Sequence, residues 1–161
     1  DGWRGMWGHH WGAEHAERWI WTHAIFAPET WLDVVMGRIR IGGWTTPWIA
    51  NGVLSLDGQR HRVGGLGKYR TTVVKESVGA CEFTLPGEVP VRGRVVRPLD
   101  ATVAWPYADP SGGTHHSLNS SLASMIIDCG GRPLSTQHGA VYELGVRETD
   151  HGIPVLPYSD G

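Results

Sequence analysis

The feature of this chain that most constrains its fold is a succession of short extended segments, each ended by a turn signal. Between Trp19 and Phe26 almost every residue is aromatic, β-branched or otherwise suited to a strand. Asp57-Gly58 separates two further extended runs, and this pair favours a β-hairpin because both turn positions need a positive φ. Turn signals about 8–14 residues apart predict an antiparallel barrel or sandwich.

We expect about nine or ten strands and almost no helix. Eleven segments are candidates for these strands, namely residues 19–26, 31–41, 48–56, 59–63, 69–78, 80–85, 93–97, 101–107, 117–127, 133–135 and 140–148. Residues 12–18 form the one plausible helical turn, and Pro106 marks its strand as an edge or a strand end. A barrel is favoured because closure removes the exposed edges of so many apolar strands.

Neither repeats nor a low-complexity linker divide the 161 residues, so we expect one domain over residues 1–161. Residues 1–18 are expected to be an irregular motif segment that leads into the barrel, and residues 150–161 a polar tail.

Charge and cysteine content exclude several classes of function. The chain has 14 basic and 16 acidic residues, so its formal charge is 14 − 16 = −2, and it lacks the basic footprint of a nucleic-acid or anionic-membrane binder. It has no apolar run of about 18 residues that would span a bilayer. Cys81 and Cys129 form no metal or redox motif, so we expect two free buried thiols and a cytoplasmic location.

Tryptophan is concentrated at the start of the chain, with eight of its nine copies before residue 50. Trp7, His9, His10, Trp11 and Glu14 stand close together in a glycine-rich stretch. Indoles supply apolar walls and imidazoles move protons near neutral pH, so this set suits a pocket for a hydrophobic ligand.

Three interpretations of these histidines stay open. His9 or His10 could bind metal with Glu14 or His15, but the spacing matches no zinc signature, so our expected site contains no metal. They could transfer protons within a pocket. They could also hydrogen-bond the backbone around an irregular turn.

Strand periodicity adds further candidates. Trp19, Trp21 and His23 share one face of their strand, which points either into a barrel cavity or outward onto a neighbouring element. Trp31 and Asp33 share a face of the next strand. There Asp33 is either a general acid with a raised pKa or an exposed strand residue.

The later strands contribute a polar stripe and two aromatic side chains. His115, His116 and Asn119 belong to a stripe that suits a ligand's hydroxyl or carbonyl and equally suits a solvent-facing strand. Trp105 and Tyr142 stand on the apolar faces of their strands, where the Tyr142 hydroxyl needs a partner if it is buried. Residues 140, 142, 144 and 146 are expected to point inward.

Gly8-His9-His10-Trp11-Gly12, followed by Arg18-Trp19-Ile20-Trp21, resembles the signature of the lipocalin-like superfamily of carotenoid 1,2-hydratases, tocopherol cyclases and AttH-type proteins. The stretch from Tyr142 to Gly152 resembles the closing strand and tail of its bacterial members. The resemblance is weak over residues 64–98. It implies an all-β, antiparallel lipocalin-like β-barrel of about 8–10 strands. It also implies that the chain matches the second of two barrel halves, so a preceding half or a homodimer partner would complete it.

The resemblance further implies protonation of a carbon–carbon double bond without a cofactor, with aromatic faces that stabilise the cation. It points to His10, Asp33 and Glu14 as candidate acids. The candidate ligand-binding residues are Trp7, His9, Trp11, Trp19, Trp21, His23, Trp31, Trp105, His116, Asn119 and Tyr142.

Three hypotheses follow. The first is a hydratase or cyclase-type enzyme that binds an isoprenoid or polyketide-like molecule in a tryptophan-lined cavity. The second is a non-catalytic carrier of an apolar ligand, and the third is a carbohydrate-binding β-sandwich. Inward-facing indoles would favour the first two, and an exposed tryptophan row would favour the third.

Overall fold

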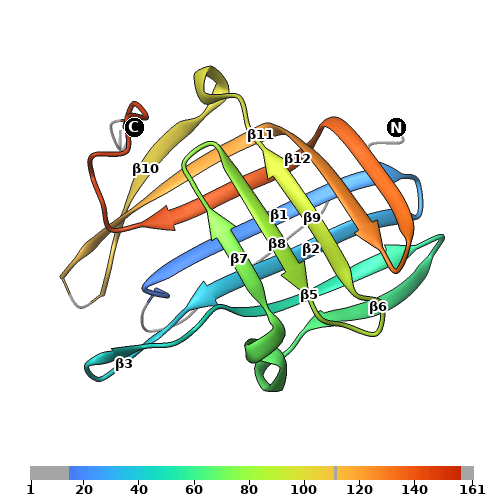
Figure 1. Ribbon diagram of the computed structural model, residues 1–161. Helices are drawn as coiled ribbons and strands as arrows, with labels where there is room; N and C mark the ends of the chain where they lie inside the picture. The colour runs from blue at the N-terminus through green and yellow to red at the C-terminus, as the bar shows by residue number, and fades with distance from the viewer. Residues whose placement is uncertain (1–14, 111, 157–161) are drawn as a thin grey trace.

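The structure is a computed structural model that describes residues 15–110 and 112–156. These residues form an almost entirely β architecture, as expected (Figure 1). The strands are β1 (Arg18–Ala27), β2 (Thr30–Arg38), β3 (Arg40–Ile41), β4 (Trp44–Thr45), β5 (Ile49–Leu56), β6 (Gln59–Gly64), β7 (Val73–Glu76), β8 (Ala80–Leu85), β9 (Val91–Val96), β10 (Val103–Ala108), β11 (Thr114–Cys129) and β12 (Arg132–Val146). Two short 3-10 helices, η1 (Leu66–Thr71) and η2 (Leu99–Ala101), complete the described chain.

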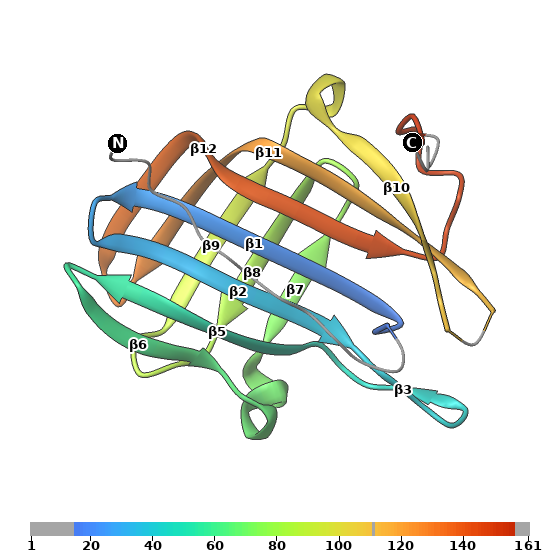
Figure 2. The same cartoon turned by 180° about the vertical axis from the view of Figure 1, so that it is seen from behind.

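The main sheet has ten antiparallel strands and curls strongly. Its order is β6-β5-β2-β1-β12-β11-β9-β8-β7, with β10 paired only to β11, while β3 and β4 form a separate hairpin. Figures 1 and 2 show the two walls of the curl, with β7, β8 and β9 on one side and β12, β1, β2 and β5 on the other.

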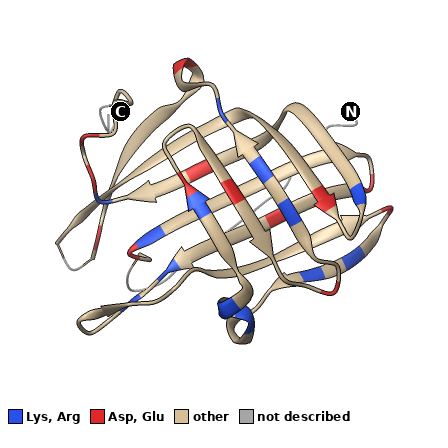
Figure 3. Ribbon diagram, in the orientation of Figure 1, with Lys and Arg blue, Asp and Glu red and all other residues tan. Residues whose placement is uncertain are grey.

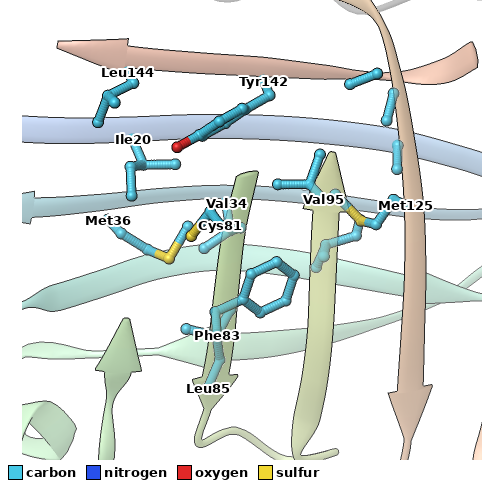
Figure 4. Packing of buried hydrophobic residues seen from close by; sticks show 14 of the residues in the cluster. Ile20, Val34, Met36, Cys81, Phe83, Leu85, Val95, Met125, Tyr142 and Leu144 are labelled. Atoms are coloured by element: carbon cyan, nitrogen blue, oxygen red, sulfur yellow. The ribbon is translucent and has the colours of Figure 1, made fainter. Parts of the chain in front are cut away.

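The core lies between these walls. Alternate residues of β1 and β2 are fully buried, because successive side chains of a strand point to opposite faces. Figure 4 shows side chains from both walls in one layer, among them Val34, Phe83 and Tyr142. The expected inward positions 140, 142, 144 and 146 are all buried, so that prediction is confirmed. Both cysteines are free and buried, as predicted.

The open edge of the curled sheet is bridged by backbone bonds. The amide of Gly64 donates to the carbonyl of Pro86 at 2.6 Å, and the amide of Glu88 donates to the carbonyl of Arg62 at 3.1 Å. Edge strand β6 therefore meets the β8–β9 connection.

Local signals account for several elements. Asp57 and Gly58 have φ values of 50° and 87°, so the predicted hairpin turn joins β5 and β6. Pro106 lies in β10, whose only strand partner among the described residues is β11. The other side of β10 makes a single bridge, from Ala104 to Val155, so the missing amide hydrogen of Pro106 interrupts no second ladder.

Several local expectations need correction. The expected strand 31–41 is divided into β2 and β3, and the expected strands 133–135 and 140–148 belong to the single strand β12. Residues 69–71 belong to η1, not to a strand, because the positive φ of Gly64 and Gly65 turns the chain before β7 begins. Residues 15–17 are not helical, and the rest of the expected helical turn lies outside the described residues. Among the described residues there is no helix with the length and apolar character needed to cross a membrane.

Candidate functional site

The β1 face that carries Trp19, Trp21 and His23 points away from the core. These three side chains are half-buried, whereas Ile20 and Ala24 between them are fully buried. The expectation that the indoles line the barrel interior is therefore wrong, and the alternative of an outward face holds for these residues. The interior is filled mainly by aliphatic side chains, together with Phe83 and Tyr142. On the outer face, the indole N–H groups of Trp19 and Trp21 reach carboxylates.

Glu143 of β12 organises the first part of this outer face. The Nε1 of Trp19 donates to its Oε1 at 2.8 Å, and the Nδ2 of Asn119 donates to its Oε2 at 3.0 Å. The strand register explains these contacts, because Glu143 lies between Trp21 of β1 and Asn119 of β11. Both oxygens of one half-buried carboxylate are thus held in fixed positions.

Asp33 of β2 organises the second part. Its Oδ2 accepts the Nε1–H of Trp21 at 3.3 Å and lies 3.0 Å from Nδ1 of His23, its partner in the register. The Asp33 side chain is 26% exposed, so solvent reaches a carboxylate that is already oriented by an imidazole. The ring of Trp31 lies 6.3 Å from that of His23 and extends the aromatic surface.

These residues share one face of adjacent strands, and we call the set the outer strip. Its members are Trp19, Trp21, His23, Trp31, Asp33, Trp105, Asn119 and Glu143. Trp105 lies on the same face as Trp19, because both belong to one row of paired residues across four strands. That row also contains Ser117 and Gly145. The Ser117 hydroxyl is buried and has no hydrogen-bond partner among the described residues.

A second polar cluster adjoins the strip at Trp19. Asp109 lies just after β10, and its Oδ1 lies 2.8 Å from Nδ1 of His15 and 2.9 Å from Nδ1 of His115. Its Oδ2 accepts a hydrogen bond from Nη1 of Arg147 at 3.0 Å. The Trp19 ring centroid lies 5.7 Å from that of His15 and 5.2 Å from that of His115.

Electrostatics favour the charged form of Asp109. Burial raises the pKa of this carboxyl, but its contacts with His15, His115 and Arg147 outweigh burial, so the pKa lies below its ordinary value. A pocket of about 390 Å³ opens beside the cluster. Its lining is formed by His15, Ala16, Glu17, Ile39, Arg40, Asp109 and Arg147.

The outer face of the opposite wall differs in kind. Figure 3 shows both basic and acidic residues along β7, β8 and β9. Lys75, Glu82, Arg92 and Arg94 are exposed there, which is the pattern of a solvated surface. The aromatic rings and oriented carboxylates described above therefore lie on the outer face of the wall that contains β1.

The structure brings together seven of the predicted site residues and separates others. Tyr142 is fully buried in the core, and its hydroxyl donates to the carbonyl of Ser77 at 2.9 Å, so it is a packing residue. His116 faces away from the outer strip, and its Nδ1 lies 2.8 Å from Nε2 of His151. The other predicted site residues lie outside the described part of the chain; they are Trp7, His9, His10, Trp11 and Glu14.

Sequence reasoning missed Glu143, Asp109, His115 and Arg147 as parts of a site. Alternation in its strand places Glu143 on the face opposite to residues 142 and 144, but the register that brings it to the indoles of β1 is not visible in the sequence. His115 stands in the predicted polar stripe, but on the opposite parity to the chosen His116. No sequence signal identifies Asp109, which contacts His15 across 94 positions of the chain.

Comparison with known proteins gives relatives without an assigned activity. Two proteins of Mycobacterium tuberculosis, each named an uncharacterized protein and found in strains CDC 1551 / Oshkosh and ATCC 25618 / H37Rv, are 29% identical to this chain over 168 residues. The matched region covers 92% of this chain and 46% of each relative, so the chain spans about half the length of the curated relatives it matches. No protein-family model and no solved structure matches the chain.

Proposed function

We propose that the outer strip binds an unsaturated apolar small molecule, isoprenoid or polyketide-like, and transfers protons to and from it. The observation that carries this proposal is the Asp33–His23 pair, a partly exposed carboxylate 3.0 Å from an imidazole and flanked by the indoles of Trp21 and Trp31. Indole faces bind flat apolar ligands and stabilise cations, and a carboxyl–imidazole pair exchanges protons near neutral pH.

The chemistry is hydration or cyclisation. The protonated pair delivers one proton to an alkene carbon, which leaves a carbocation opposite the indole faces. In hydration, water adds to the cation and the resulting oxonium loses one O–H proton to the carboxylate. In cyclisation, a second double bond of the ligand adds to the cation, and the new carbocation loses one C–H proton to the carboxylate and forms a double bond. The atoms balance without an oxidant or reductant. Glu143 of β12 is two strands away from Asp33 of β2 on the same face and offers a second fixed carboxylate.

The outward orientation of the indoles argues against a tryptophan-lined cavity inside the barrel and favours a second candidate, a carbohydrate ligand. The indoles of Trp19 and Trp21 lie on an outer face beside two carboxylates and the amide of Asn119. Tryptophan faces stack on sugar rings, and carboxylates accept hydrogen bonds from sugar hydroxyls. The two ligand classes differ in a directly measurable way.

The test is a titration of tryptophan fluorescence with a panel of terpenoid alkenes and, separately, a panel of oligosaccharides. We expect terpenoids to quench or shift the emission and the Trp21→Ala variant to lose most of that response. A response to oligosaccharides alone would replace the first candidate with the second. A response to neither would reject ligand binding by the outer strip.

Catalysis is tested by incubating the protein with the terpenoids that bind and following the products by mass spectrometry. Asp33→Asn should leave binding intact and slow turnover by about 100-fold or more, the usual contribution of a positioned acid. Glu82→Gln, which changes an exposed carboxylate of the opposite wall, is the matched control and should behave as the unmodified protein. Equal turnover in Asp33→Asn would remove Asp33 as the acid.

A further inference from the structure

We propose that His15, His115 and Asp109 bind a divalent first-row transition metal ion. The three residues come from the segment before β1, from β11 and from the turn after β10, and their ligand atoms lie within 4.8 Å of one another. Two imidazoles and one carboxylate are a ligand set that zinc and non-haem iron sites use, with the remaining positions open to water or substrate. This proposal is independent of the function proposed for the outer strip.

The hydrogen bonding of His115 fixes which of its nitrogens faces the cluster. Its Nε2 lies 3.3 Å from the backbone carbonyl of Glu17, and a carbonyl oxygen only accepts, so Nε2 carries the hydrogen. In the neutral imidazole the lone pair is then on Nδ1, which points at Oδ1 of Asp109 from 2.9 Å. Two acceptors at that distance need a cation between them or beside them, either a proton or a metal ion. A backbone carbonyl that orients the remote nitrogen is a usual feature of metal-binding histidines.

The distances suit a shared ion after small side-chain rotations. Ligand bonds to zinc and similar ions are about 2.0–2.2 Å, so ligand atoms at right angles on one ion lie about 3 Å apart and tetrahedral ones about 3.4 Å apart. The two His–Asp contacts measure 2.8 and 2.9 Å. The imidazole planes of His15 and His115 are nearly perpendicular, at 89°, so their lone pairs approach from different sides.

Charge and access also favour a dication. Asp109 and Glu17 contribute two negative charges and Arg147, which bonds both, contributes one positive charge, so the directly bonded groups have one excess negative charge. Arg40 adds a second positive charge to the lining of the adjoining pocket. Arg147 engages Oδ2 of Asp109, which leaves Oδ1 to the histidines. The side chains of His115 and Asp109 are 0% and 4% exposed, whereas His15 is 35% exposed and lines the 390 Å³ pocket. The pocket therefore gives the fourth coordination position a route to solvent.

The experiment uses Co²⁺ as a spectroscopic probe and Zn²⁺ as a competitor, added to the full chain after chelator treatment. We expect one Co²⁺ per chain with a visible d–d band that Zn²⁺ abolishes. His15→Ala and Asp109→Asn should each weaken Co²⁺ binding by at least about 100-fold, because even outer-shell partners of a metal are worth about 10- to 100-fold. Circular dichroism checks that each variant is folded. If Asp109→Asn fails to fold, His15→Ala alone decides the outcome, because His15 precedes β1 and is not part of the sheet.

A matched control is His61→Ala, which removes another imidazole near a carboxylate, 3.7 Å from Glu88, and should bind Co²⁺ normally. Absence of the d–d band in the unmodified protein would overturn the proposal. So would a band that survives in His15→Ala and disappears in a His9→Ala/His10→Ala double variant, because the metal would then be bound elsewhere.

Discussion

Arg97 is a buried cation that stabilises the end of the barrel through backbone carbonyls. Its Nε donates to Val78 at 2.5 Å, and its Nη1 donates to the carbonyls of Leu118 at 2.5 Å and Tyr142 at 3.2 Å. The guanidinium also lies 4.5 Å from the ring centroid of Tyr142. Burial lowers the pKa of Arg97 to about 10, so the side chain still carries its charge at neutral pH.

Replacing Arg97 should therefore destabilise the protein strongly. Arg97→Met leaves several buried carbonyls without a donor, and we expect the free energy of unfolding to fall by about 3 kcal/mol in urea denaturation. Arg94→Met, a change to an exposed arginine of β9, should alter it by less than about 0.5 kcal/mol. Equal stability of the two variants would contradict a structural role for Arg97.

The two thiols give a prediction about reactivity and pH. Burial raises the pKa of Cys81 to about 12 and that of Cys129 to about 11, above the ordinary 9.0, so neither forms appreciable thiolate at pH 8. A thiol reagent should label both only after unfolding. Because the unfolded thiols ionise first, the free energy of unfolding should decline as the pH rises from about 9 towards 11–12. Rapid labelling of the native protein would show that the thiols are accessible.

At the scale of the strands, β1 and β12 depend on a close contact between an indole and a glycine. A side chain added at Gly145 would place its Cβ 2.1 Å from the Trp19 ring, which lies over that residue. On the other side of Trp19 in the register, a Cβ at Gly37 would meet atoms no closer than 3.8 Å.

Gly145→Ala should displace the Trp19 ring and break its hydrogen bond to Glu143, whereas Gly37→Ala should be tolerated. We expect a fall of about 1–3 kcal/mol in the free energy of unfolding and a changed near-ultraviolet circular dichroism spectrum for Gly145→Ala alone. Similar spectra for both variants would show that the ring does not depend on Gly145.

The strands were largely predictable from the sequence, and their orientation was not. The pattern located β1 and β8 closely, because half-buried strands need a period of two, but it divided β12 into two segments. Alternation leaves open which face is interior, and large aromatic residues suggested the wrong face of β1. The direction in which the Trp19 side chain points depends on the curl of the sheet and on its hydrogen bond to Glu143, which lies 124 positions away in the sequence. The cluster around Asp109 was unpredictable for the same reason, since loops far apart in sequence assemble it.

At the scale of the whole molecule, both walls contribute to one core, so they should unfold together. Leu85 of β8 and Leu144 of β12 are both fully buried in the same cluster. Leu85→Ala and Leu144→Ala should each lower the free energy of unfolding by about 2–5 kcal/mol in a single transition. Far-ultraviolet circular dichroism and tryptophan fluorescence should give coincident curves. Separate transitions by the two probes would show that the walls are independent units.

Strand β1 has a consequence for how mutations distribute along it. Its even-numbered positions from Ile20 to Ala24 fill the core, while its odd-numbered positions from Trp19 to His23 belong to the outer strip. In a saturation screen that scores cellular abundance and ligand binding separately, the two phenotypes should alternate from one codon to the next. The interior can therefore be redesigned for thermal stability while the outer strip is left as it is.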